Sequence, residues 1–215
     1  SSYPRLIDYS ILRSIADEVS AYFLVDMAHI AGLVAARVIP SPIPHAHFVT
    51  FTTYKTMMGP HGGVILCQGE FAKKIDRAVF PGTQGTPTLS LVAGKAVCFY
   101  LAGTSHFRRI QERTLRTART LAQELSARGY RLVTGGTENH MILVDLRSKG
   151  LKGDRAEAAL AAAGILSNRN AIPFDPEPIQ VTSGLRLGTA GTSARGLEDG
   201  EVKIVARWID EILSD

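Results

Sequence analysis

The segment "AYFLVDMAH", residues 21–29, constrains the fold more than any other part of the chain. It is an apolar run of strand length, and it follows directly on "YSILRSIADEV", residues 9–19, where apolar side chains recur at helical spacing. A helix followed by a buried strand is the alternation of α/β proteins. Because the run lacks polar alternation, it also predicts a strand that is covered on both faces.

The chain continues this alternation as far as residue 103. "HFVTFTT" (47–53) and "GGVILC" (62–67) predict two more strands. Pro40, Pro42 and Pro44 exclude a regular helix at that point of the intervening crossover. A Gly, Thr and Pro loop that begins with "FPGTQGTP" then leads into an apolar segment that predicts a buried helix. We assign residues 1–103 to a first domain.

Residues 104–215 predict a second, smaller α/β domain. It opens with a long basic amphipathic helix over about 104–128 and closes with a helix over 197–214. Between them we expect strands at "YRLVTGG" (130–136), "NHMILVDL" (139–146) and "GLRLGT" (184–189), and a helix at "GDRAEAALAAAG" (153–164).

Composition and charge argue against several classes of function. The 24 Lys and Arg give a net charge of only +4 and are scattered, so we expect no nucleic-acid partner. No window of membrane-span length is apolar and no secretory leader is visible, so we expect no membrane association and a cytoplasmic location. Cys67 and Cys98 lack metal-ligand spacing, so we expect neither a metal site nor a disulfide.

Asp26 and Lys55 are the residues that first suggest a reaction. Asp26 ends the first predicted strand and Lys55 lies just beyond the second. Lys55 lies 29 residues after Asp26, a distance that suits one crossover, which brings two strand ends to the same edge of a parallel sheet. A carboxylate and an amine at one edge are the two anchors that pyridoxal phosphate requires. The alternatives are that Asp26 caps the next helix and that Lys55 reaches solvent from a strand end.

The segment "VDMAHIAGLVAARVIPSPIPHAHFVTFTTYKTMMGPHGGVIL" resembles the serine hydroxymethyltransferases, pyridoxal phosphate enzymes of fold-type I that exchange serine and glycine using tetrahydrofolate. "FPGTQGTP", "AGKAV", "GGTENHMILVDL", "NRNAIPFDP" and "TSGLRLGT" follow in the family's order. The resemblance implies the second half of the large domain, with a mainly parallel sheet, and a small C-terminal α/β domain. It implies cleavage or formation of a Cα–Cβ bond in a β-hydroxy amino acid, with tetrahydrofolate as a possible co-substrate.

The resemblance also assigns roles to residues of the first domain. Lys55 resembles the Schiff-base lysine, Asp26 the partner of the pyridine nitrogen, and His29 a group near the cofactor's reactive end; the alternative for His29 is a half-buried structural histidine. By resemblance, Ser1 lies near the cofactor and Thr52 bonds its phosphate.

Further roles point to shared sites and to the substrate. Gly85 and Thr86 match a loop that reaches the phosphate of the neighbouring subunit's cofactor, which implies a homodimer. Arg186 resembles the arginine that grips the substrate carboxylate, although it could instead be a surface arginine of a strand. Asn170 lies in the segment that resembles the family's folate contact.

Three positions depart from the family pattern: this chain has Tyr54 where the family has His, His61 where it has Arg, and Thr86 where it has Gly. We count Tyr54 among the candidate catalytic residues because it adjoins Lys55. The departures leave open a threonine transaldolase or an α-methylserine hydroxymethyltransferase in place of serine–glycine exchange.

Family chains are about twice as long, and their first half supplies further cofactor and substrate contacts that we do not locate here. We therefore expect this chain alone to be catalytically incomplete, with its front half missing, cleaved, disordered or supplied by a separate polypeptide. The alternative is a non-catalytic half-enzyme that associates with an active homologue.

Overall fold

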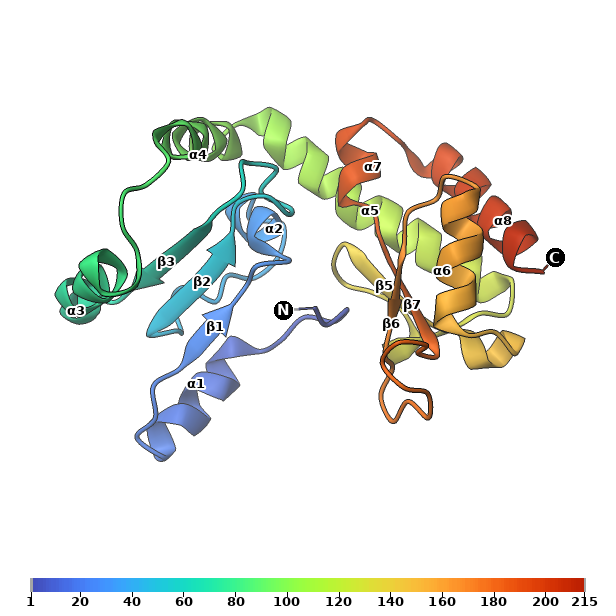
Figure 1. The fold of residues 1–215 in the computed structure, drawn as a ribbon, viewed down its shortest axis with the longest axis horizontal. Helices are drawn as coiled ribbons and strands as arrows, with labels where there is room; N and C mark the ends of the chain where they lie inside the picture. Colours follow the sequence, from blue (N-terminus) through green and yellow to red (C-terminus); the bar gives the residue numbers. More distant parts are fainter. Residues whose placement is uncertain (1, 215) are drawn as a thin grey trace. The chain divides into compact units, whose positions relative to one another are not determined.

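The computed structural model describes residues 2–214, which divide into two compact units (Figure 1). Unit 1 is Leu6–Gln111, and unit 2 comprises Ser2–Arg5 and the chain from Glu112 onward. The division falls within one long helix, α5 (Ser105–Ala127). The domain boundary predicted between residues 103 and 104 stays a prediction.

Unit 1 is built on a three-stranded sheet in the order β1-β2-β3 (Figure 1). β1 (Leu24–Asp26) pairs in parallel with β2 (Phe48–Thr52), as the crossover predicted. β3 (Gly63–Cys67) runs antiparallel to β2, because only a short turn separates them. The described three-stranded sheet is therefore mixed, whereas the resemblance implied a mainly parallel one. The other elements of unit 1 are α1 (Tyr9–Glu18), α2 (Ala31–Ala35), η1 (Gly69–Phe71), α3 (Ala72–Arg77), η2 (Ala78–Thr83) and α4 (Leu89–Ala102).

The predicted helices and strands of unit 1 form, but two expectations about their burial are wrong. The strand within residues 21–29 was expected to be covered on both faces, yet in β1 only Val25 is buried and Leu24 is 55% exposed; β3 likewise has no residue that is buried by the described chain. Helix α4 was expected to be buried, yet Cys98 is its only buried residue. The apolar face of α1 is likewise open, with Ile15 51% and Val19 68% exposed. No described element packs over these surfaces, which leaves much of the apolar surface of unit 1 uncovered.

Unit 2 contains a four-stranded antiparallel sheet in the order β4-β5-β7-β6. β5 (Met141–Asp145) and β7 (Gly184–Gly188) are its central strands, with β4 (Arg131–Leu132) and β6 (Asn168–Asn170) at the edges. The remaining elements are η3 (Val133–Gly135), η4 (Leu146–Lys149), α6 (Gly153–Ala162), α7 (Ala190–Ala194) and α8 (Asp199–Ser214). The sequence did not predict β6 or α7, because both are short and lack periodicity.

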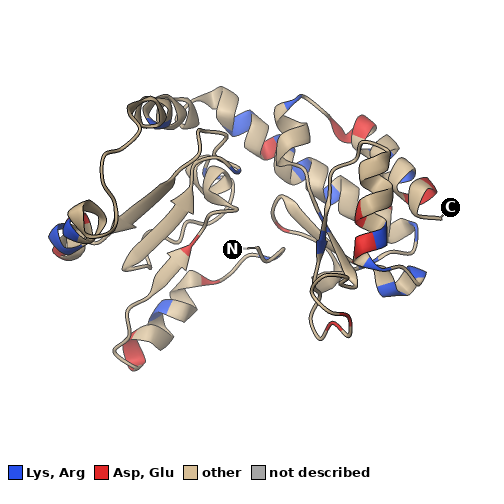
Figure 2. Ribbon diagram, in the orientation of Figure 1, with Lys and Arg blue, Asp and Glu red and all other residues tan. Residues whose placement is uncertain are grey.

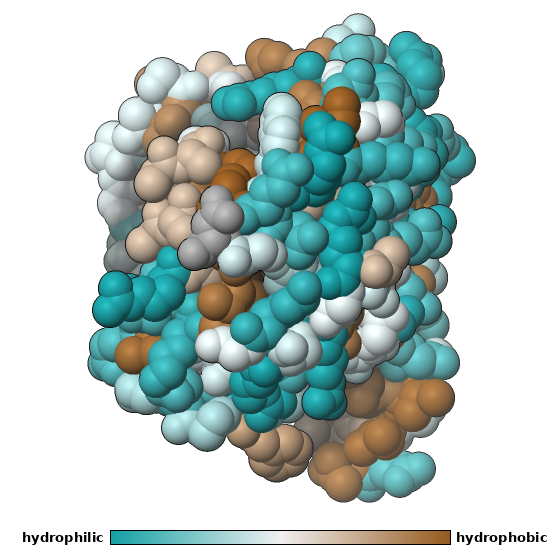
Figure 3. Space-filling view, turned by 90° about the vertical axis from the view of Figure 1, so that its right-hand side faces the viewer, coloured by the Kyte–Doolittle hydropathy of each residue, from teal (hydrophilic) through white to brown (hydrophobic). Residues whose placement is uncertain are grey.

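The core of unit 2 lies between this sheet and helices α5, α6 and α8. Leu125 of α5, Leu160 of α6 and Ile142 of β5 are fully buried in it, and Ile209 of α8 is 2% exposed. The side on which α6 and α8 lie in Figure 1 faces the viewer in Figure 3, where it is mostly hydrophilic with a few separate apolar areas. Unit 2 thus has the closed core that unit 1 lacks.

Charged residues occur in most helices (Figure 2), and two arginines of the basic run of α5 form ion pairs. Arg113 bonds Glu198 at 2.7 Å, and Arg116 bonds both Glu198 and Asp199 at the start of α8. These ion pairs join two helices of unit 2. Within residues 2–214, no helix combines the length and apolar character that a membrane crossing requires.

The core of unit 2 yields a stability prediction. Leu125→Ala removes a fully buried side chain and should lower the free energy of unfolding by about 2–5 kcal/mol, because it leaves a cavity among α5, α6 and α8. Denaturant unfolding followed by circular dichroism measures this. The control is Gln123→Ala at an exposed position of the same helix, which should leave stability nearly unchanged. Equal stabilities for the two variants would contradict the described core.

Candidate functional site

Asp26 lies at the end of β1, at the edge where the chain also leaves β2. Asp26 is paired with Thr50 in the parallel register, and the amide of Met27 donates to the Thr50 carbonyl at 2.9 Å. One carboxylate oxygen, Oδ1, accepts the amide of Ala28 at 2.8 Å. The side chain is exposed, and its other oxygen has no recorded hydrogen bond within the described chain. One oxygen of Asp26 therefore holds the backbone at the start of the crossover, and the other oxygen is able to accept a further hydrogen bond.

Lys55 lies in a turn of residues 53–59 that follows β2 at the same edge of the sheet. The Gly59 amide donates to the Thr53 carbonyl at 2.7 Å, and the Met58 amide donates to the Lys55 carbonyl at 2.9 Å. Met58 has a left-handed backbone, with φ of 60°. The Lys55 side chain is half-buried and makes no ion pair or hydrogen bond within residues 2–214; its Nζ lies 5.7 Å from the centre of the Tyr54 ring. We call this segment the lysine turn.

Thr56 joins the lysine turn to the residues that follow β1. Its hydroxyl donates to the His29 carbonyl at 2.9 Å and accepts the amide of Gly32 at 3.0 Å. Its carbonyl accepts Nε2 of Gln111 at 2.9 Å. Gly32 is needed here because a Cβ at that position would lie 2.1 Å from the Thr56 carbonyl oxygen. Sequence reasoning noted the Thr56 hydroxyl only as a possible cofactor contact, and it missed Gly32 and Gln111; the glycine in "HIAGLVAA" was the available signal.

A cavity of about 950 Å³ opens beside this edge of the sheet. Asp26, Thr52 and His61 line it, together with Lys95 of α4, whose Nζ donates to the Gly63 carbonyl at 3.1 Å. Its size is within the usual range of small-molecule sites. Lys55 and His29 are not among its lining residues.

The two aromatic departures from the family pattern form a pair. The rings of Tyr54 and His61 stack with their centres 3.9 Å apart and their planes at 9°. Both residues are exposed; Tyr54 lies within the lysine turn, next to Lys55, and His61 lies just after the turn. Burial raises the pKa of the nearby Cys98 thiol, which donates to the Met57 carbonyl and helps to hold the turn.

The other site residues predicted for unit 1 lie in several different places. His29 is half-buried, and Thr52 is half-buried with its hydroxyl 3.5 Å from the Ala28 carbonyl. Gly85 and Thr86 are exposed in the loop before α4 and do not line the cavity, although Gln84 does. Ser1 lies outside the described residues. The roles predicted for all of them stay predictions.

Arg186 and Asn170 lie together on the sheet of unit 2. Arg186 of β7 is directly opposite Asn168 of β6, and Asn170 is opposite Gly184, so these side chains share one face of the sheet. A guanidinium nitrogen of Arg186 is 3.5 Å from the Asn168 side-chain oxygen. Asn170 donates to the Ala171 carbonyl at 2.7 Å. Asn168, which sequence reasoning missed, is thus the neighbour of Arg186.

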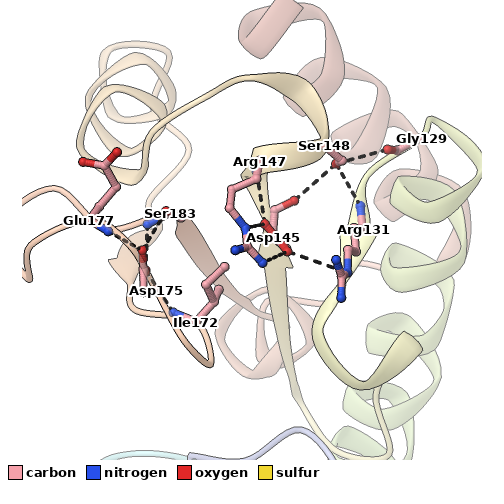
Figure 4. Close-up of polar contacts among 9 residues, drawn as sticks. All are labelled: Gly129, Arg131, Asp145, Arg147, Ser148, Ile172, Asp175, Glu177 and Ser183. Atoms are coloured by element: carbon pink, nitrogen blue, oxygen red, sulfur yellow. Dashed lines mark hydrogen bonds and ion pairs between the residues drawn. The ribbon is translucent and has the colours of Figure 1, made fainter.

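The loop that follows Asn170 is held by Asp175 (Figure 4). Its carboxylate accepts the amides of Ile172, Glu177 and Ser183 and the hydroxyl of Ser183, the last at 2.7 Å. Burial alone would raise the pKa of Asp175, but these hydrogen bonds outweigh it and lower the pKa to about 2. In the same view, the Arg147 side chain holds the pKa of Asp145 below its usual value. Phe174, 99% exposed with φ of 55°, projects from this fixed loop.

The residues of unit 1 fit pyridoxal phosphate by their chemistry. Lys55 supplies a primary amine without an ion-pair partner in the described chain, and Asp26 supplies a carboxylate oxygen able to accept from a protonated ring nitrogen. Asp26 and the Thr52 hydroxyl border one cavity. Among residues 2–214, no cluster of three or more His, Cys, Asp or Glu side chains is arranged to hold a metal ion.

The chain matches a model of a known protein family. The family model described as serine hydroxymethyltransferase matches residues 1–209. The match covers nearly the whole chain and includes every candidate site residue.

Gly32 offers a test of the close approach between α2 and the lysine turn. Gly32→Ala should lower the free energy of unfolding by about 1–3 kcal/mol, because the added Cβ would clash with backbone atoms of Thr56. Gly69→Ala is the control, since a Cβ there meets no atom within 4 Å. Denaturant unfolding of both variants measures the difference. A Gly32→Ala protein as stable as Gly69→Ala would contradict the described contact.

Asp175 predicts a pH dependence for its loop. Because folding lowers the pKa of this group from 3.8 to about 2, its stabilising contribution is complete above pH 4 and is lost as the pH falls towards 2. Asp175→Asn should therefore be less stable than the parent at pH 6, and the difference should narrow below pH 4. Unfolding curves at several pH values measure this, with Asp76→Asn on exposed α3 as the control. A difference that does not change with pH would contradict the role of Asp175.

Proposed function

The chain belongs to the serine hydroxymethyltransferase family, and from this premise we propose that it breaks and forms the Cα–Cβ bond of a β-hydroxy amino acid with pyridoxal phosphate. The observation that carries the proposal is the placement of Asp26 and Lys55 at one edge of the β1–β2 pair. A lysine with no ion-pair partner in the described chain, at the same sheet edge as a carboxylate able to accept a hydrogen bond, is an arrangement suited to this cofactor.

Each residue has a role in this proposal. When bound, pyridoxal phosphate supplies an electrophilic carbon and a sink for the electron pair left at Cα. Lys55 would hold the cofactor through its amine. Asp26 would accept the hydrogen bond of the protonated ring nitrogen. Arg186 binds the substrate carboxylate through its guanidinium, and Asn170 lies in the segment proposed to contact folate.

The stack of Tyr54 and His61 supports a changed reaction within the same chemistry. A stacked pair beside the lysine turn fixes the shape of this part of the site, where the family pattern has two basic groups. We therefore propose that the acceptor or the substrate differs from the family's usual one, as in a threonine transaldolase or an α-methylserine hydroxymethyltransferase. A need for tetrahydrofolate distinguishes a hydroxymethyltransferase from a transaldolase.

The open apolar surfaces of unit 1 support association with another polypeptide. Large apolar side chains are exposed along α1 and α4, for example Ile11 at 57% and Leu89 at 74%. Surfaces of this kind usually mark interaction sites. We propose that a second subunit or a separate N-terminal half covers them and completes the site. A non-catalytic half-enzyme that associates with an active homologue is the alternative that these surfaces also favour.

Lysine modification tests the proposed function. The chain is mixed with one equivalent of pyridoxal phosphate, reduced with borohydride and digested, and the peptides are weighed by mass spectrometry. We expect the adduct on Lys55, lost in Lys55→Ala and retained in Lys73→Ala, because Lys73 is an exposed lysine of α3. An adduct on other lysines, or one that survives unchanged in Lys55→Ala, would overturn the proposal.

Substrate assays then separate the reactions. The chain, with the polypeptide that associates with it, is given serine, threonine or α-methylserine, each with and without tetrahydrofolate. Release of an aldehyde without folate indicates the transaldolase type, and a strict need for folate indicates a hydroxymethyltransferase. If the associated polypeptide shows the same activity with and without this chain, the result would indicate the non-catalytic alternative.

A further inference from the structure

Gln111 is a buried polar residue that the proposed chemistry does not use. It lies on α5, and its exposed fraction is 0%. Its side-chain nitrogen Nε2 donates to the carbonyl of Thr56, the residue directly after Lys55, at 2.9 Å. Its oxygen Oε1 is buried and has no hydrogen-bond partner within the described chain.

The Thr56 carbonyl depends on this side chain. The backbone hydrogen bonds of the lysine turn join Met58 to Lys55 and Gly59 to Thr53, and neither reaches Thr56. A buried carbonyl without a hydrogen-bond donor is unfavourable, so a donor from outside the turn is needed. Gln111 supplies it from a residue 55 positions further along the chain.

Packing alone does not account for a glutamine at this position. Methionine has a similar length and shape and would fill the same space without an unsatisfied oxygen. Retaining the amide leaves Oε1 buried and unpaired, which is unfavourable in itself. The amide is therefore best explained by its hydrogen bond to the turn.

Thr56 is held at both of its polar groups. Gln111 holds its carbonyl, while its hydroxyl bonds the His29 carbonyl and the Gly32 amide. These bonds fix the backbone immediately after Lys55, and with it the direction in which the Lys55 side chain leaves the turn. We propose that Gln111 is a positioning residue for Lys55. This inference rests on the proposed function of Lys55.

Hydrogen exchange in the protein without cofactor tests the anchoring. Gln111→Met keeps the length of the side chain and removes the donor, so the Met58 and Gly59 amides should exchange roughly fivefold faster, as expected for the loss of one hydrogen bond. Gln123→Met, at an exposed position of the same helix, is the matched control and should not change exchange. Unchanged exchange in Gln111→Met, or acceleration throughout unit 1, would overturn the positioning role.

A conservative variant separates hydrogen bonding from packing. In Gln111→Glu the carboxylate cannot donate at pH 8, but a protonated carboxyl can, and burial favours protonation. Protection of the Met58 and Gly59 amides should therefore match Gln111→Met at pH 8 and recover towards the parent at pH 5. A role in packing alone predicts no such recovery, so its absence would overturn the proposal.

The link to Lys55 is measured by the borohydride adduct. Gln111→Met should lower the yield at Lys55 roughly fivefold at limiting pyridoxal phosphate, whereas Gln123→Met should not. An unchanged yield in Gln111→Met would overturn the positioning role. An adduct absent from Lys55 in the parent protein would instead overturn the proposed function, so the two failures are distinguishable.

Discussion

The parallel pairing of β1 with β2 is the constraint on which the candidate site depends. A parallel pair requires a crossover, so the chain leaves both strands at the same edge of the sheet. Asp26 ends the first strand, and the lysine turn follows the second. Neither position has a local reason to be close to the other. Their proximity follows from strand direction, and the Thr56 hydroxyl then secures it by joining the two segments.

The two units are stabilised to different degrees by the described chain. In unit 2, three helices cover the sheet, and the core side chains of α5, α6 and α8 are almost entirely withdrawn from solvent. In unit 1, α4 and β3 have apolar sequences but remain largely exposed. Since burial of apolar surface is the main favourable term in folding, unit 1 gains less from its own sequence. Its stability therefore depends more on hydrogen bonds such as those of the lysine turn and, in the proposed assembly, on the polypeptide that covers its open faces.

Sequence patterns predicted where helices and strands form better than they predicted which of these elements are buried and what they contact. Periodicity identified α1, α5, α6 and α8, and the crossover length placed Asp26 near Lys55. The apolar character of α4 predicted burial, but hydropathy does not specify which chain provides the cover. The bond from Gln111 to Thr56 spans 55 residues and has no local signature, so only the folded chain reveals it. The same holds for Asn168 beside Arg186, because β6 is too short to show a strand pattern.

The stack of Tyr54 and His61 changes how the departures from the family pattern are interpreted. Taken separately, each replaces a basic group near Lys55 and suggests loss of function. In the folded chain the two rings are in parallel contact at 3.9 Å, so each residue gives the other a packing partner. Replacements that fit one another are more consistent with a reshaped site than with random decay. Together with Lys55 and Asp26 at one edge of the sheet, the pair is the structural basis for proposing an altered substrate preference.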